Sequence, residues 1–204
     1  GAATSDPVPV EPYTNSLKKT IEFFGREEKG RFRFVTKYSD VDSLLDAEHN
    51  NHTEIRFSIN TPRIINEHEH YTASANKRIE SAVKLARAGY QIGFIIAPVF
   101  LYEGWKEEYK NLIISIKEAL PKDFDKKIIF EVISHRYTTK AKNRILEIYP
   151  DTLLPMENED RKFKYGQFGY GKYVYDKEQL DDMKEFFLKE INGVFKNSLI
   201  KYII

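Results

Sequence analysis

The 204-residue chain is long enough to bury one hydrophobic core, so we expect a single domain. Its 32 basic and 31 acidic side chains exclude a global charge that would draw it onto DNA or an acidic membrane. The absence of cysteine excludes thiolate nucleophiles, disulfides and cysteine-bound metal clusters within this chain. Neither a long apolar run nor a secretory signal is readable, and we therefore expect a cytoplasmic protein without a membrane span.

The first part of the chain alternates between predicted strands and predicted helices. After a proline-rich start, residues 15–25 are expected to form a helix capped by Asn15 or Thr14. Four strand-then-helix units follow, with strands at 31–38, 54–60, 92–100 and 127–135 and helices at 41–49, 75–89, 103–120 and 139–150. Such alternation favours parallel strands joined by right-handed crossovers, in a barrel or in a doubly wound sheet.

Both of these folds gather functional loops at the C-terminal ends of the strands. The residues expected at those ends are Lys37 and Tyr38, Ser58 to Asn60, Ala97 to Tyr102, and His135 to Tyr137. His135 and Arg136 are candidates for a DNA phosphate contact or an active-site hydrogen bond, and a buried, internally bonded histidine is the alternative. Trp105 is expected to pack beneath its own helix.

The segment RKFKYGQFGYGKYVY, residues 161–175, is predicted to be a β-hairpin. It holds six aromatic residues, four basic residues and three glycines, and no acid. Aromatic and basic residues alternate along both arms, with Gln167 and Phe168 near the tip between Gly166 and Gly169. The aromatic arms suit packing against the protein, whereas an exposed ring beside a basic cluster resembles the wedge of proteins that extrude bases from a duplex. After it, residues 176–195 have the pattern of an amphipathic helix.

No metal site is predicted from the histidines. His68 and His70 fall in a stretch expected to be a polar loop, and neither this pair nor His49 and His52 has the HExxH spacing of a helical zinc site. Glycine-rich phosphate loops of the GxxxxGK[ST] or GxGxxG type do not follow any predicted strand.

Several segments, taken in order, carry a more specific signal. They are FVTKY in the first predicted strand, RFSIN in the second, GFIIAPV followed by YEGW, HRYT after the fourth strand, and the hairpin's GQFGYGKYVY. In this combination the chain, from Ala2 to its C-terminus, resembles the spore photoproduct lyase family. The members of that family are radical S-adenosylmethionine (SAM) enzymes that repair a thymine dimer of UV-damaged spore DNA.

The resemblance implies an α/β fold, the C-terminal portion of a partial (β/α)6 TIM-type barrel with parallel strands. Residues 1–150 would supply β/α units, and residues 151–204 a hairpin and a C-terminal helix of the same domain. It also implies two cofactors, SAM and a [4Fe–4S] cluster held by a CxxxCxxC motif in the N-terminal part of the barrel. Because this chain has no cysteine, we expect a fragment, or a descendant without the redox half, that is inactive alone.

The implied reaction is that of a DNA repair lyase. A SAM-derived 5′-deoxyadenosyl radical takes a hydrogen from C6 of the thymine adduct, the methylene bridge breaks, and return of a hydrogen leaves two thymines. Expected partners are UV-damaged double-stranded DNA, the N-terminal part of the barrel and an electron donor. Ala3 stands where many relatives have the hydrogen-donor cysteine, so another donor acts, the residue was replaced deliberately, or repair ends in an aberrant product.

The resemblance also assigns site residues. Ser5, Lys37, Ser58 and the backbone of Ala97 match positions that line the SAM pocket, and Asn60 shares a strand face with Ser58. The hairpin matches the element that separates the two strands at the lesion, with Gln167 and Phe168 at the tip positions where an Arg-Tyr pair is typical. The residues expected to contact DNA are His135, Arg136, Arg161, Lys164, Gln167, Phe168 and Lys172. The alternatives are a non-catalytic nucleic-acid-binding module that uses the same hairpin, and a half-barrel scaffold whose aromatic residues mediate self-association.

Overall fold

The computed structural model describes residues 1, 5–159, 161–165 and 171–204. The predictions for Ala3, Gln167 and Phe168 lie outside the described residues. The central element is a five-stranded parallel sheet with the order β1-β2-β3-β4-β7. Its strands are β1 (Phe32–Thr36), β2 (Thr53–Ile59), β3 (Gln91–Val99), β4 (Ile128–Ser134) and β7 (Ser198–Ile203).

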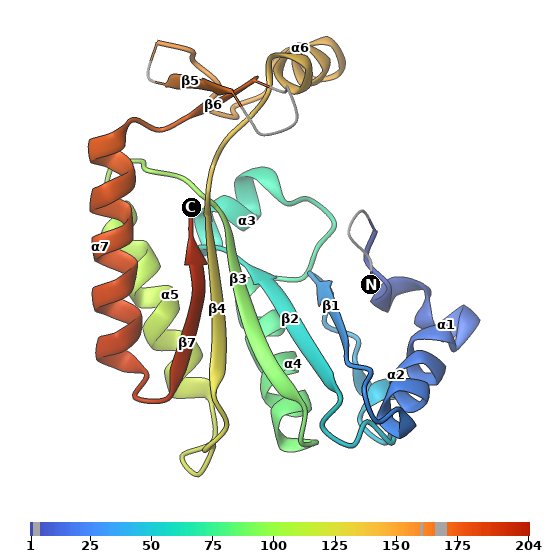
Figure 1. Cartoon of the computed structure of the whole chain (residues 1–204). Coiled ribbons are helices and arrows are strands. Elements are labelled where there is room, and N and C mark those ends of the chain that lie inside the picture. The colour runs from blue at the N-terminus through green and yellow to red at the C-terminus, as the bar shows by residue number, and fades with distance from the viewer. Residues whose placement is uncertain (2–4, 160, 166–170) are drawn as a thin grey trace.

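The five strands lie side by side in the order in which they occur in the chain. The main helices lie along one face of the sheet (Figure 1). Those helices are α4 (Ala75–Arg87), α5 (Trp105–Ala119) and α7 (Lys177–Val194). A doubly wound sheet would reverse its strand order and carry helices on both faces. The fold is therefore part of a β/α barrel, as predicted, and none of these three helices lies on the other, concave face of the sheet (Figure 1).

The core fills the layer between the sheet and these helices. Phe57, Phe94 and Phe130 project from three neighbouring strands into it and are fully or almost fully buried. Trp105, at the start of α5, packs edge-on against Phe186 of α7 at 4.9 Å between ring centroids, which confirms its expected packing role. The buried residues of α7 follow the predicted helical spacing.

Two predicted elements differ in the structure. Residues 41–49 form only a short 3₁₀ turn, η2 (Asp42–Leu44), instead of a crossover helix. The place of that helix is taken by α2 (Ser16–Arg26), whose Gly25 lies against the Glu48 backbone more closely than any Cβ would allow. Of the two expected caps of α2, Asn15 makes no capping bond, whereas Thr14 Oγ1 accepts from the Ser16 amide at 3.3 Å. The Glu11 carboxylate accepts from the next two amides, those of Leu17 and Lys18, at 2.7 and 3.0 Å.

Two elements that follow β2 in the chain were not predicted from the sequence. The supposed polar loop after β2 begins with α3 (Pro62–His68), which Thr61 caps by accepting from the Ile64 amide at 3.4 Å. The last residues form β7, and α7 is the crossover that returns the chain from β4 to this fifth strand. The helix at α6 (Thr139–Ile148) therefore does not cover the sheet and buries none of its residues.

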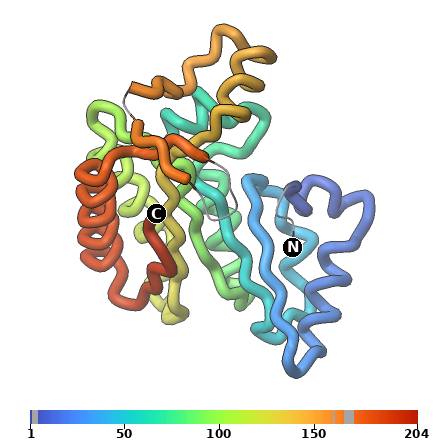
Figure 2. The backbone as a smooth tube through the Cα atoms, turned by 45° about the horizontal axis from the view of Figure 1, so that its top comes forward, coloured from blue at the N-terminus to red at the C-terminus, as the bar shows by residue number. Residues whose placement is uncertain are grey.

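The predicted hairpin is confirmed for the described residues of its two arms, β5 (Lys162–Tyr165) and β6 (Gly171–Val174), which pair antiparallel. Figures 1 and 2 show the hairpin and α6 beyond the C-terminal ends of the sheet strands. Short helical turns, η1 (Val8–Val10) and α1 (Glu11–Thr14), precede α2 at the other edge of the sheet. Among the described residues, no helix has both the length and the apolar character that a membrane crossing requires.

The concave face of the sheet carries a network of charges. Arg56 of β2 reaches across β3 and donates to both carboxylate oxygens of Glu131 on β4, at 3.0 and 2.9 Å. The hydroxyl of Tyr202 donates to the same carboxylate at 2.9 Å. Gly93 of β3 lies under this crossing, where an added Cβ would come within 3.1 Å of Arg56 Cγ. A buried carboxylate of this kind is stable only while its cationic partner stays in place.

We expect Gly93→Val to destabilise the full-length protein by about 1–3 kcal/mol, because the added side chain displaces Arg56 from the buried Glu131. Urea unfolding would measure the change. Gly193→Ala is the matched control, since nothing lies within 4 Å of its added Cβ in α7, and there the free energy of unfolding should stay equal or rise by up to about 1 kcal/mol. Equal stability of the Gly93 variant and the wild type would contradict this account.

Candidate functional site

The predicted cofactor residues lie at the C-terminal ends of three adjacent strands. Lys37 directly follows β1, Ser58 is the penultimate residue of β2, and Ala97 lies near the end of β3. Parallel pairing brings these three ends to one edge of the sheet. At Ala97 the β3–β4 register shifts, because Ile96 pairs with Val132 and Val99 with Ser134, which leaves one more residue on β3 than on β4.

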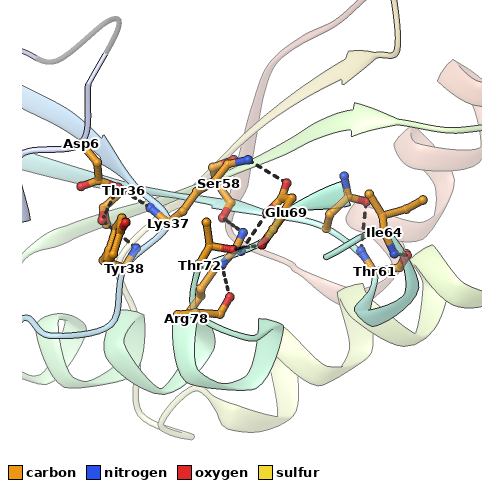
Figure 3. A network of polar contacts seen from close by, with 12 residues as sticks. Asp6, Thr36, Lys37, Tyr38, Ser58, Thr61, Ile64, Glu69, Thr72 and Arg78 are labelled. Atoms are coloured by element: carbon orange, nitrogen blue, oxygen red, sulfur yellow. Dashed lines mark hydrogen bonds and ion pairs between the residues drawn. The ribbon is translucent and has the colours of Figure 1, made fainter. Parts of the chain in front are cut away.

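Lys37 is the outermost member of a chain of alternating charges (Figure 3). Its ammonium donates to Glu69 Oε1 at 2.7 Å, and Glu69 Oε2 lies 2.7 Å from Arg78 Nη2 in an ion pair. Side-chain exposure falls along the chain, from 34% at Lys37 to 6% at Glu69 and 0% at Arg78. The three charges sum to +1, and the partly exposed end of the chain is the cation.

Arg78 fixes this chain of charges to the core. Its guanidinium donates to the Ser58 carbonyl at 2.9 Å, to the Ala73 carbonyl at 2.7 Å and to Thr72 Oγ1 at 2.7 Å. The residue therefore ties α4 and the loop before it to the strand that carries Ser58. Sequence reasoning missed both Glu69 and Arg78, because a polar loop and a mixed helix face gave no sign that the two would meet.

The segment before η1 holds Ser5 near Lys37. Asp6 Oδ2 accepts from the Lys37 amide at 2.7 Å and from Thr36 Oγ1 at 3.0 Å. The adjacent Ser5 is exposed. The edge of the sheet thus combines a cation, hydroxyl groups and the backbone at Ala97, which is a donor set suited to a carboxylate with neighbouring hydroxyl groups.

Asn60, also predicted to bind the cofactor, is fully buried and uses its amide within the protein. Its Nδ2 donates to the Pro98 carbonyl at 2.6 Å, while its Oδ1 accepts from the Thr61 amide at 3.0 Å and from the Tyr109 hydroxyl at 2.8 Å. These bonds lock the ends of β2 and β3 together. Asn60 therefore holds these strand ends in shape, and its side chain has no exposed surface.

The two faces of the hairpin differ in chemistry. In its register Phe163 opposes Tyr173, and Lys164 opposes Lys172. Successive side chains of a strand point to opposite faces, so one face is aromatic and the other is basic. Phe163 and Tyr173 pack edge-to-face at 5.1 Å, and Tyr165 at the aromatic face is 80% exposed.

The root of the hairpin is bound to the end of β4. Tyr137 exchanges two backbone hydrogen bonds with Tyr173, at 3.2 and 2.7 Å, and their rings stack at 5.3 Å. Arg161 donates to the His135 carbonyl at 3.0 Å and lies 3.6 Å from the centroid of the Tyr175 ring. Arg161, predicted as a DNA contact, is thus occupied in holding the hairpin against the sheet.

His135 is buried as well, with 7% of its surface exposed. It stacks on Phe100 at 4.4 Å, and its Nδ1 lies 3.2 Å from Arg161 Nη2. Burial, together with the positive charge of Arg161, lowers the pKa of His135 to about 3. The ring is therefore neutral at physiological pH and brings no positive charge to a phosphate, which corresponds to the alternative of a buried, internally bonded histidine.

Among the described residues, no group of three or more histidine, cysteine, aspartate or glutamate side chains is placed to hold a metal ion. His68 does not lie in a loop as expected, because it ends α3, where its ring faces Phe100 at 5.5 Å. Burial lowers the pKa of His68, and the neighbouring His70 adds to that effect.

Comparisons with known proteins identify the sequence family of this chain. Over residues 1–204 the chain matches the sequence family described as "Spore photoproduct lyase". The chain belongs to the spore photoproduct lyase family. A spore photoproduct lyase of Clostridium acetobutylicum is 60% identical over 204 residues, and one of Bacillus subtilis is 45% identical over 201 residues. The chain spans 60% and 59% of the lengths of these two family members.

Solved structures of the family show the same fold. A double mutant of spore photoproduct lyase with bound AdoMet and dinucleoside spore photoproduct matches with a TM-score of 0.95 and 42% identity. A spore photoproduct lyase complexed with dinucleoside spore photoproduct matches equally well. Each match covers 100% of this chain and 60% of the family member.

The buried neutral His135 predicts an acid-dependent loss of stability. Its pKa is about 3 in the folded protein and 6.5 ordinarily, so the unfolded state binds more protons between these values. The stabilising contribution is complete above pH 6.5 and is lost toward pH 3, by up to about 1.4 kcal/mol per pH unit. We expect His135→Gln to reduce this slope in urea unfolding of the full-length protein. The exposed His70→Gln should keep the slope, and a loss of slope there instead would contradict the assignment.

Proposed function

We propose that this chain is the part of a DNA repair lyase that positions SAM and grips the damaged duplex. The whole enzyme would split the spore photoproduct thymine dimer back to two thymines. The proposal rests mainly on one arrangement: the Lys37–Glu69–Arg78 chain of charges presents a single half-exposed ammonium beside Ser58 at the strand ends. The family membership supports it.

The residues at the strand ends fit the amino-acid portion of SAM. Lys37 would pair with its carboxylate through a charge-assisted hydrogen bond, and the hydroxyls of Ser5 and Ser58 and the backbone at Ala97 would bond its polar groups. When bound and reductively cleaved at the iron–sulfur cluster, SAM supplies the radical that opens the thymine dimer. The cluster itself does not fit this chain, because the chain has no thiolate to bind it. We therefore assign it to the N-terminal part of the barrel.

The hairpin would act on DNA. Its basic face would supply Lys164 and Lys172 to phosphates, and Gln167 and Phe168, which the sequence predicts near the tip, would contact the lesion. A lesion that pairs badly costs less to extrude than an intact base pair, and an inserted ring exploits that difference. Arg161 and His135 serve this function indirectly, since their contacts hold the hairpin root beyond the strand ends.

The assignments of Lys37 to SAM and of Phe168 to DNA predict opposite effects on the affinities for these two ligands. In the full-length enzyme, Lys37→Ala should weaken SAM binding about 10- to 100-fold through loss of the charge-assisted bond, with near-normal affinity for damaged duplex. Calorimetric titration with SAM and a duplex-binding assay would measure the two affinities. Lys84→Ala is the matched control, because it removes another lysine that pairs with an acid, at 2.7 Å from Asp42 on the surface.

Phe168→Ala should do the reverse, weakening binding to damaged duplex while SAM affinity stays near normal. If either variant lost both affinities equally, the residues would have been assigned to the wrong sites. Salt-sensitive duplex binding by a full-length protein that does not bind SAM would instead support the non-catalytic module.

A further inference from the structure

The basic face of the hairpin forms one wall of a groove of about 320 Å³. Its other walls come from the end of β4, from α7 and from the end of β7. The lining residues are Ser134, Arg136, Lys164, Tyr165, Lys172, Val174, Leu180, Lys184, Ile203 and Ile204. Four of these side chains are cationic and none is acidic, while Val174, Leu180 and the two isoleucines supply apolar surface.

The cations of this groove have few close acidic partners. Among the residues that the structure describes, Arg136, Lys164 and Lys172 form no ion pair, and Lys184 has only Asp181 at 3.9 Å. Other surface lysines among these residues, such as Lys189, are unpaired as well, whereas Lys18, Lys84 and Lys106 each lie 2.6–2.8 Å from an aspartate oxygen. The groove is distinctive because four cations line one hollow that no described acidic side chain lines.

The pairing of the hairpin adds an independent observation. Lys164 and Lys172 stand directly opposite each other, and like charges in such a pair destabilise it. Arg136 and Lys184 then bring two further positive charges to the same groove. A bound anion would turn this repulsion into attraction to a shared ligand.

We propose that this groove binds the phosphodiester backbone of one DNA strand, and that Lys184 of α7 is one of its phosphate ligands. The inference rests on the proposed function and extends the DNA surface from the hairpin onto α7. Arg136 offers a planar guanidinium to two phosphate oxygens, and the lysines add point charges along the strand. The exposed Tyr165 at the rim can stack on a base or sugar of the same strand.

The two faces of the hairpin would then have different roles. The basic face would hold the backbone against α7, and Phe163 and Tyr173 of the aromatic face stay on the opposite side, while Tyr165 at the end of β5 reaches the rim of the groove. Contacts to phosphates carry no sequence information, so the groove would bind undamaged and damaged duplex alike. Such a contact sets the position of the protein on DNA, and the recognition of the lesion is left to the tip.

The test is the salt dependence of DNA binding by the full-length enzyme, with an undamaged duplex as probe. Loss of one phosphate contact lowers the slope of log affinity against log salt by about 0.9. For Lys184→Ala, the fall in affinity over a fourfold rise in salt should therefore be about threefold smaller than for wild type. Lys184→Arg should restore it, and Lys189→Ala, an exposed lysine of the same helix outside the groove, should leave the slope unchanged.

The outcomes separate this inference from the proposed function. If Lys164→Ala and Lys172→Ala lower the slope but Lys184→Ala does not, the hairpin binds DNA and the groove on α7 is overturned. An unchanged slope in all three variants would overturn both proposals. Binding of poly-glutamate that depends on Lys184, without any change in DNA binding, would mark the groove as a site for an acidic protein segment and would also overturn the inference.

Discussion

The buried guanidinium of Arg78 is the interaction on which the candidate site depends. It holds the Ser58 carbonyl, the loop before α4 and the Glu69 carboxylate at one point, and it has no exposed surface. A charge buried so completely is tolerated only when its donors are bonded and a counter-charge is close. Because Glu69 meets that requirement with one oxygen, its other oxygen is left to orient Lys37 at the edge of the sheet. The position of the outermost cation is thus decided in the core.

The concave face of the sheet follows a similar rule. Glu131 is almost fully buried there, and it is accommodated because Arg56 reaches it from β2 across β3 and Tyr202 approaches it from the neighbouring β7. The space for Arg56 exists because β3 carries a glycine at the crossing. Polar residues can therefore line the interior of this half-barrel without cost to the outer core, in which three phenylalanines pack against the helices. The outer face of the sheet packs against the helices, and the concave face carries the charged network.

Basic residues at the hairpin have two different roles: some anchor its root, and others have no partner within the described part of the protein. Arg161 and His135 look like DNA contacts in the sequence, yet they bond each other and fix the hairpin root. The lysines of the basic face have no such partners in the described part of the chain, and they remain available to a ligand. A hairpin without this anchoring would be marginal in water, because two short strands bury little surface. Arg161 and the neutral His135 thus hold in place the hairpin that carries the lysines of the basic face.

The sequence by itself determined the strand and helix periods, the parallel order of the first four strands, the hairpin with its alternating faces and the family to which the chain belongs. These signals are local, since they depend on neighbours two to four residues apart or on short motifs. The tertiary structure decided the contacts between distant residues: Glu69 with Lys37, 32 residues away, and Arg161 with His135, 26 residues away. It also decided that α2 replaces the helix expected at 41–49, and that β7 completes the sheet. Whether a charged side chain is bound internally or left for a ligand depends on which partner the fold brings within about 4 Å, and no local pattern records that distance.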